Sequence, residues 1–194
     1  MSITINASAI LNNLTANNSY AFSSTKRIVK YNSDADETRQ SASSLKHKLR
    51  SLKDIDTSDG PTARTQNKIK SFVNTYNDLM SSASGITGSK KLTKYMDKMD
   101  SLFSEYEDSL KSLGITRTST NKLKFDTTNF SDVTSTKLDA VFGEDEHFVS
   151  DSIKYAKAIS SAAQQALNTP ENVLEQPLFL YLPVIQPWLS LISS

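Results

Sequence analysis

The chain has 194 residues, which suits one domain of ordinary size or one domain with a tail. Its hydrophobic content of 37% is below the globular average, and the absence of cysteine excludes disulfides and thiolate metal or catalytic sites. The 22 lysines and arginines almost balance the 21 aspartates and glutamates, and a net charge of +1 argues against a protein that binds nucleic acid or anionic membranes.

The N-terminal segment, residues 1–33, is rich in Asn, Ser, Thr and Ala and carries a short helical stripe of Ile10, Leu11 and Leu14. We expect a flexible or partner-dependent segment here. It has no basic region followed by a hydrophobic region, so we expect no cleaved Sec signal, which leaves export by another route open.

Residues 34–168 have the apolar spacing of a helical domain. Ser33 or Asp34 is a candidate N-cap, with Asp36 or Glu37 three residues later as in a capping box. Three-or-four spacing then predicts one helix, and Pro61 suits the first turn of the next, which should end at Gly85. The first stripe is Ala42, Leu45, Leu49, Leu52 and Ile55, and the second is Ile69, Phe72, Val73, Tyr76, Leu79, Met80 and Ala83.

The third predicted helix has the strongest amphipathic pattern of the chain. Ser89 can cap it, and Gly114 is well placed as its C-terminal stop. Short connections between helices of similar length favour antiparallel neighbours. Its stripe is Leu92, Tyr95, Met96, Met99, Leu102, Phe103, Tyr106, Leu110 and Leu113, which we interpret as a buried face.

Two short segments, 115–117 and 122–125, can pair as a β ribbon near 115–125 that must lie against the helices, since so short a ribbon is marginal alone. A structured loop is the equally weighted alternative. Two further helices are expected around 132–142 and 145–167, the second with its apolar residues on one face and with carboxylates in "GEDE" at its start.

The tail, residues 169–194, changes abruptly to apolar residues interrupted by Pro177, Pro183 and Pro187, which forbid one continuous helix. It is too short and too broken to span a bilayer, so we expect no membrane insertion. Aromatic residues often anchor interfaces, yet packing on the chain's own body would use them equally well. The candidate interface residues are Leu178, Phe179, Tyr181, Trp188 and Leu189.

No motif in the sequence indicates catalysis, a metal or another cofactor. His47 and His147 lie far apart and lack partners at metal-ligand spacing. "DIDTSDG" begins like a calcium loop, but Asp59 and Thr65 stand where the pattern needs Gly and Glu. The acidic "GEDE" is explained by helix capping. We expect a protein that is not an enzyme and needs no cofactor.

Several motifs occur in an order that resembles a known family. They are "IKSFVNTYNDLM" (69–80), "SLGI" (112–115), "KLKFD" (122–126) and "LDAVF" (138–142). Together they resemble the C-terminal helical region of the flagellar filament capping protein, also called hook-associated protein 2, over about half of the chain. The 68 residues before the match leave no room for that family's head domains, so the chain looks like a reduced relative.

The resemblance implies a secreted, self-assembling component with a coiled-coil core. The helical stripes and short connections predict a mainly α fold, an antiparallel helical hairpin or bundle with coiled-coil-like packing and one small β ribbon, and the resemblance agrees with it. The expected function is a non-enzymatic structural or assembly protein of a bacterial flagellum or related surface appendage. It should form a homo-oligomer or bind flagellin-like subunits. The alternatives are a cytoplasmic helical adaptor or export chaperone that binds one partner, and a helical protein of a phage or secretion apparatus.

Overall fold

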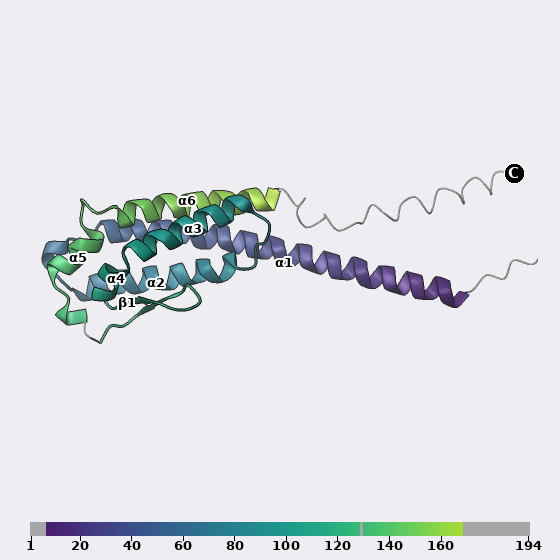
Figure 1. Cartoon of the computed structure of the whole chain (residues 1–194), viewed down its shortest axis with the longest axis horizontal. Helices are drawn as coiled ribbons and strands as arrows, with labels where there is room; N and C mark the ends of the chain where they lie inside the picture. The colour runs from purple at the N-terminus through teal and green to yellow at the C-terminus, as the bar shows by residue number, and fades with distance from the viewer. Residues whose placement is uncertain (1–6, 129, 169–194) are drawn as a thin grey trace, which may run out of the picture. The chain divides into compact units, whose positions relative to one another are not determined.

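The computed structural model describes residues 7–128 and 130–168 (Figure 1). It confirms a mainly helical protein with one small two-stranded antiparallel sheet. In chain order the elements are α1 (Ala7–Lys53), η1 (Thr57–Asp59), α2 (Ala63–Ala83), α3 (Lys90–Glu105), α4 (Glu107–Ser112), β1 (Ile115–Arg117), β2 (Leu123–Phe125), η2 (Phe130–Asp132), α5 (Ser135–Phe142) and α6 (His147–Asn168).

The chain divides into two units. The first, which we call the body, comprises Asn32–Asn168. The second comprises residues 1–31 and 169–194, of which the structure describes 7–31, all within α1. The organisation into segments 1–33, 34–168 and 169–194 stays a prediction.

Helix α1 begins at Ala7, so the predicted N-cap at Ser33 or Asp34 is wrong. The first 59 residues contain neither Pro nor Gly, so nothing in the sequence breaks a helix before Gly60. The residues that resemble a capping box bond within the helix instead. Ser33 Oγ donates to Glu37 Oε1 at 3.0 Å, and Arg39 Nη2 donates to Asp36 Oδ1 at 2.7 Å.

The body part of α1 has a heptad seam. Its buried residues recur at alternating three- and four-residue intervals, which is the spacing of coiled-coil packing. Predicted core positions from 42 to 55 are all buried, and the seam extends one heptad further toward the N-terminus. The seam comprises Ala35, Thr38, Ala42, Leu45, Leu49 and Leu52.

Helices α2 and α3 run in opposite directions in Figure 1, as their short connection predicts. Ser89 caps α3 as predicted, since its Oγ accepts from the Leu92 N–H at 3.3 Å. Pro61 lies outside α2, contrary to prediction, because the Thr62 hydroxyl accepts from the Thr65 N–H at 3.1 Å and makes Thr62 the N-cap.

The third predicted helix is two helices. α3 ends at Glu105, and α4 begins at Glu107. Tyr106 lies at the junction with φ −96° and ψ 14°, outside the regular helical range, while its hydroxyl donates to Glu146 Oε2 at 2.9 Å. Gly114 ends this region as predicted, with φ +81°, a conformation that favours glycine.

The core of the body is an aromatic cluster from three helices. Phe72 and Tyr76 come from α2, Phe103 from α3 and Phe148 from α6, and all four are buried. The ring centroids of Tyr76 and Phe103 are 4.6 Å apart, and those of Phe103 and Phe148 are 5.1 Å apart at a 71° angle. Such tilted and edge-on contacts add to the free energy gained by burial.

The ribbon is present, and the loop alternative is thereby excluded. β1 and β2 pair antiparallel with Ile115 opposite Phe125 and Arg117 opposite Leu123. The ribbon lies against α2, as its shortness requires, and both Ile115 and Leu123 are buried.

Candidate interaction surfaces

The interface residues predicted from the sequence, Leu178, Phe179, Tyr181, Trp188 and Leu189, lie outside the described residues. The candidate surfaces of the described residues lie within 7–128 and 130–168. Within these ranges no helix is long and apolar enough to cross a membrane.

The segment that begins like a calcium loop has a local structural role. Asp56 N-caps η1, with its Oδ1 accepting from the Ser58 N–H at 3.0 Å and from Ser58 Oγ at 2.5 Å. These hydrogen bonds lower the pKa of Asp56 below its usual range. Among the described residues, no group of three or more His, Asp or Glu side chains could hold a metal ion.

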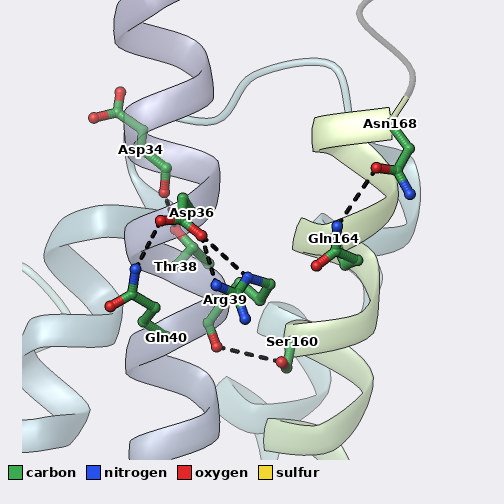
Figure 2. A network of polar contacts seen from close by, with 8 residues as sticks. All are labelled: Asp34, Asp36, Thr38, Arg39, Gln40, Ser160, Gln164 and Asn168. Carbon is green, nitrogen blue, oxygen red and sulfur yellow. Dashed lines mark hydrogen bonds and ion pairs between the residues drawn. The ribbon is translucent and has the colours of Figure 1, made fainter.

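The body also contains a group of polar contacts on α1 and α6 (Figure 2). Asp36 accepts from Arg39 Nε at 3.1 Å and from Gln40 Nε2 at 2.7 Å. The hydrogen bond from Arg39, and after it the one from Gln40, lowers the pKa of Asp36. The Arg39 carbonyl accepts from Ser160 Oγ at 3.2 Å, which joins α1 to α6. Because these charges have partners within the chain, we do not regard this region as a binding surface.

An exposed apolar pair lies on the part of α1 outside the body. Phe22 is 74% exposed and Val29 is 63% exposed, and they are the large hydrophobic side chains that stand out as exposed within the described part of the chain. They are one heptad apart, so they share a face of the helix. Lys26, also exposed, lies between them on that face. Isolated exposed apolar residues are ordinary, but two on one helical stripe form a candidate contact face.

The Asn and Ser content of residues 1–33 does not predict this pair, nor does the stripe of Ile10, Leu11 and Leu14, of whose side chains nothing is described. The seven-residue spacing of Phe22 and Val29 was the available signal.

A basic groove lies between α1 and α2 in the body and has a volume of about 600 Å³. Every side chain that lines it can donate a hydrogen bond, and none is a carboxylate. Its lining residues are His47, Lys48, Ser51, Arg64, Asn67, Lys68 and Ser71. His47 is exposed and lies here, whereas His147 is exposed at the first turn of α6, so the two histidines stay apart.

The turn between α5 and α6 carries the opposite charge. We call Glu144 and Asp145, both exposed, the acidic turn. The neighbouring carboxylates are occupied inside the chain: Glu146 accepts from Tyr106 Oη at 2.9 Å, and Asp139 accepts from Thr57 Oγ1 at 3.1 Å. Burial, followed by the hydrogen bond to Glu146, raises the pKa of Tyr106.

Comparison with family models, with curated proteins and with solved structures finds no match to this chain.

Proposed function

We propose that the chain is a structural or assembly protein of a bacterial flagellum or a related surface appendage. It associates through helical faces with copies of itself or with flagellin-like subunits, and it acts without catalysis. The observation that carries the proposal is the exposed apolar pair Phe22 and Val29 on α1.

Burial of this pair would favour association. Removing a large apolar side chain from water stabilises a complex by roughly 1.5–3 kcal/mol when burial is complete. Phe22 and Val29 point from the same face, so one partner helix or groove can cover both. Lys26 between them favours a partner that combines apolar side chains with carboxylates.

The resemblance to the capping protein family supports the flagellar part of the proposal. The residues that carry it are core residues of the body: Phe72, Val73 and Tyr76 are buried, as are Val141 and Phe142. Because core positions specify a fold and leave the partner open, the resemblance supports the architecture first and the cellular role second.

The test is the solution mass of the full chain, measured by light scattering over a range of concentrations. We expect a mass that rises with concentration for the native chain and rises much less for Phe22→Ser/Val29→Ser. The matched control is Ala16→Ser/Ser23→Ala, a pair with the same seven-residue spacing at exposed positions on another face of α1, and it should assemble normally. A chain that ends at Asn168 tests the predicted tail interface separately.

The location of the protein separates this proposal from its alternative. A flagellar or surface component should be found in the culture supernatant and in purified appendages. A cytoplasmic adaptor or export chaperone would remain in the cell and form a complex of fixed stoichiometry with one other protein through the same face of α1. A native chain that is monomeric at every concentration and stays in the cell would refute the assembly proposal.

A further inference from the structure

We infer that the basic groove of one copy binds the acidic turn of a second copy. This inference rests on the proposed self-association and assigns to it a second, electrostatic contact that uses the body alone. It identifies both surfaces, Lys48 and Arg64 on one side and Glu144 and Asp145 on the other.

The groove carries positive charge that the chain does not neutralise. Among the ion pairs of the described residues, Arg39 pairs with Asp36 and Arg117 pairs with Asp100. Neither Lys48 nor Arg64 has such a partner among the described residues. Lys68 is held differently, because its Nζ donates to the Asp54 carbonyl at 3.1 Å.

The arrangement of donors suits a carboxylate ligand. A carboxylate has two oxygens that accept several hydrogen bonds, and an arginine can bind it through two parallel bonds. Arg64 and Lys68 on α2 face Lys48 and Ser51 on α1 across the groove, so a ligand there meets donors from both helices. Asn67 adds a neutral amide to the same wall.

The acidic turn is a suitable occupant because its two carboxylates are adjacent, exposed and not engaged in an ion pair among the described residues. The N-terminus of α6 follows at His147 and stabilises nearby negative charge through the helix dipole. That effect leaves the carboxylate oxygens accessible to a second molecule. Glu146 is less available to bind the groove of a second copy, because the Tyr106 hydroxyl already donates to it.

A second copy is the occupant that the charges favour. The whole chain is almost neutral, with a net charge of +1, so two copies do not repel each other strongly. The groove contains no carboxylate and the turn offers two, with Lys53 beside them, which makes the chain complementary to itself. Exposed ion pairs contribute little individually, so the contact should be weak, and it should weaken further as salt screens it over about 10 Å at 0.1 M.

The experiment exchanges the charges. Because the chain contains no cysteine, Ser161→Cys at an exposed position of α6 gives one labelling site for fluorescence anisotropy. Self-association is measured for the native chain, for Lys48→Glu/Arg64→Glu and for Glu144→Lys/Asp145→Lys, all as full chains. We expect each variant to associate on the order of tenfold more weakly than the native chain. An equal mixture of the two variants should regain association, because the new acidic groove meets the new basic turn.

The control variant is Lys90→Glu/Lys157→Glu, which makes the same change in net charge at exposed positions outside the groove. It should associate like the native chain, and circular dichroism should show native helix content for every variant. Association that neither pair of reversals weakens would overturn the inference. If both variants associate more weakly and their mixture does not regain association, the inference is also overturned. The groove would then bind an anionic partner other than the acidic turn. Neither result bears on the Phe22 and Val29 test, so the two proposals can fail separately.

Discussion

Asn77 pairs with Leu123 as a neighbouring strand would. The amide Nδ2 of Asn77 donates to the Leu123 carbonyl at 2.9 Å, and its Oδ1 accepts from the Leu123 N–H at 2.8 Å. The two backbone groups belong to the edge of β2 that faces α2. Buried backbone donors and acceptors need partners, and one side chain of α2 here supplies both. This contact joins residues 46 positions apart and fixes the ribbon on the helices.

The substitution Asn77→Ala should lower the free energy of unfolding by about 1–3 kcal/mol, because it leaves the N–H and carbonyl of Leu123 without their partner in a half-buried position. Urea unfolding measures the change, and hydrogen exchange at the Leu123 amide should become faster. Asn74→Ala, at an exposed position one turn earlier in α2, is the control and should change stability little. Equal losses for the two variants would show that the pairing does not stabilise the ribbon.

The helices of the body were predictable because burial follows the period of the helix. The stripes around Leu45 in α1 and Phe72 in α2 could be located from spacing alone, and both are buried. Ser89 and Gly114 were predictable for a different reason, since a capping hydroxyl and a positive φ each favour particular residue types.

Boundaries that depend on competing local bonds could not be predicted. Ser33 can cap a helix, but within one it can also donate to Glu37, and only the structure distinguishes these outcomes. Tyr106 continues the apolar stripe of α3, yet the helix is interrupted there. The Asn77 contact is even harder to predict from the sequence, because no local pattern connects a helix with an edge strand 46 residues later.

The candidate surfaces were partly accessible from the sequence. An antiparallel turn near Pro61 brings Lys48 close to Arg64, so folding the predicted hairpin would have indicated the basic groove. The acidic residues of "GEDE" are predicted from the sequence as a capping feature. That Glu146 and Asp139 already have partners, which singles out Glu144 and Asp145, is known only from the structure.

Gly114 should be the least replaceable glycine of the ribbon region. It has φ +81°, and an added Cβ would lie 2.5 Å from the backbone carbonyl oxygen of Asp126. We expect Gly114→Ala to lower the free energy of unfolding by about 2–4 kcal/mol, since strain in φ and a clash with backbone act together. Gly88→Ala is the comparison for the strain in φ, because Gly88 has a similar φ of +84°, and should cost about 1 kcal/mol. Similar losses measured by urea unfolding would mean that the contact with Asp126 relaxes without cost.

The same substitution at two phenylalanines should separate the core from the contact face. Phe148 is fully buried in the aromatic cluster, so Phe148→Ala should lower the free energy of unfolding by about 3–5 kcal/mol. Phe22→Ala removes a side chain that is 74% exposed and should change the stability of the dilute protein by about 0.5 kcal/mol or less. Calorimetry at low protein concentration measures both. A large loss at Phe22 in the monomer would contradict its assignment as a contact residue for another molecule.

Tyr76 should make the body sensitive to alkaline pH. Burial raises the pKa of its hydroxyl from 10.0 to about 12, although the charge of Arg117 acts in the opposite direction. Below pH 10 the phenol is protonated in both the folded and the unfolded chain, so it adds no pH dependence. Between pH 10 and 12 the unfolded chain loses this proton more readily, and the free energy of unfolding falls by up to about 2–3 kcal/mol.

The substitution Tyr76→Phe should remove this contribution. The hydroxyl is buried and has no hydrogen-bond partner among the described residues, so its loss should cost little at neutral pH. Urea unfolding of the variant and the native chain at neutral pH and between pH 10 and 12 measures the difference, which should grow with pH in favour of the variant. Tyr95→Phe, at a half-buried position of α3, is the control and should follow the native chain. If Tyr76→Phe loses stability with pH as steeply as the native chain, burial of Tyr76 is not what limits stability in alkali.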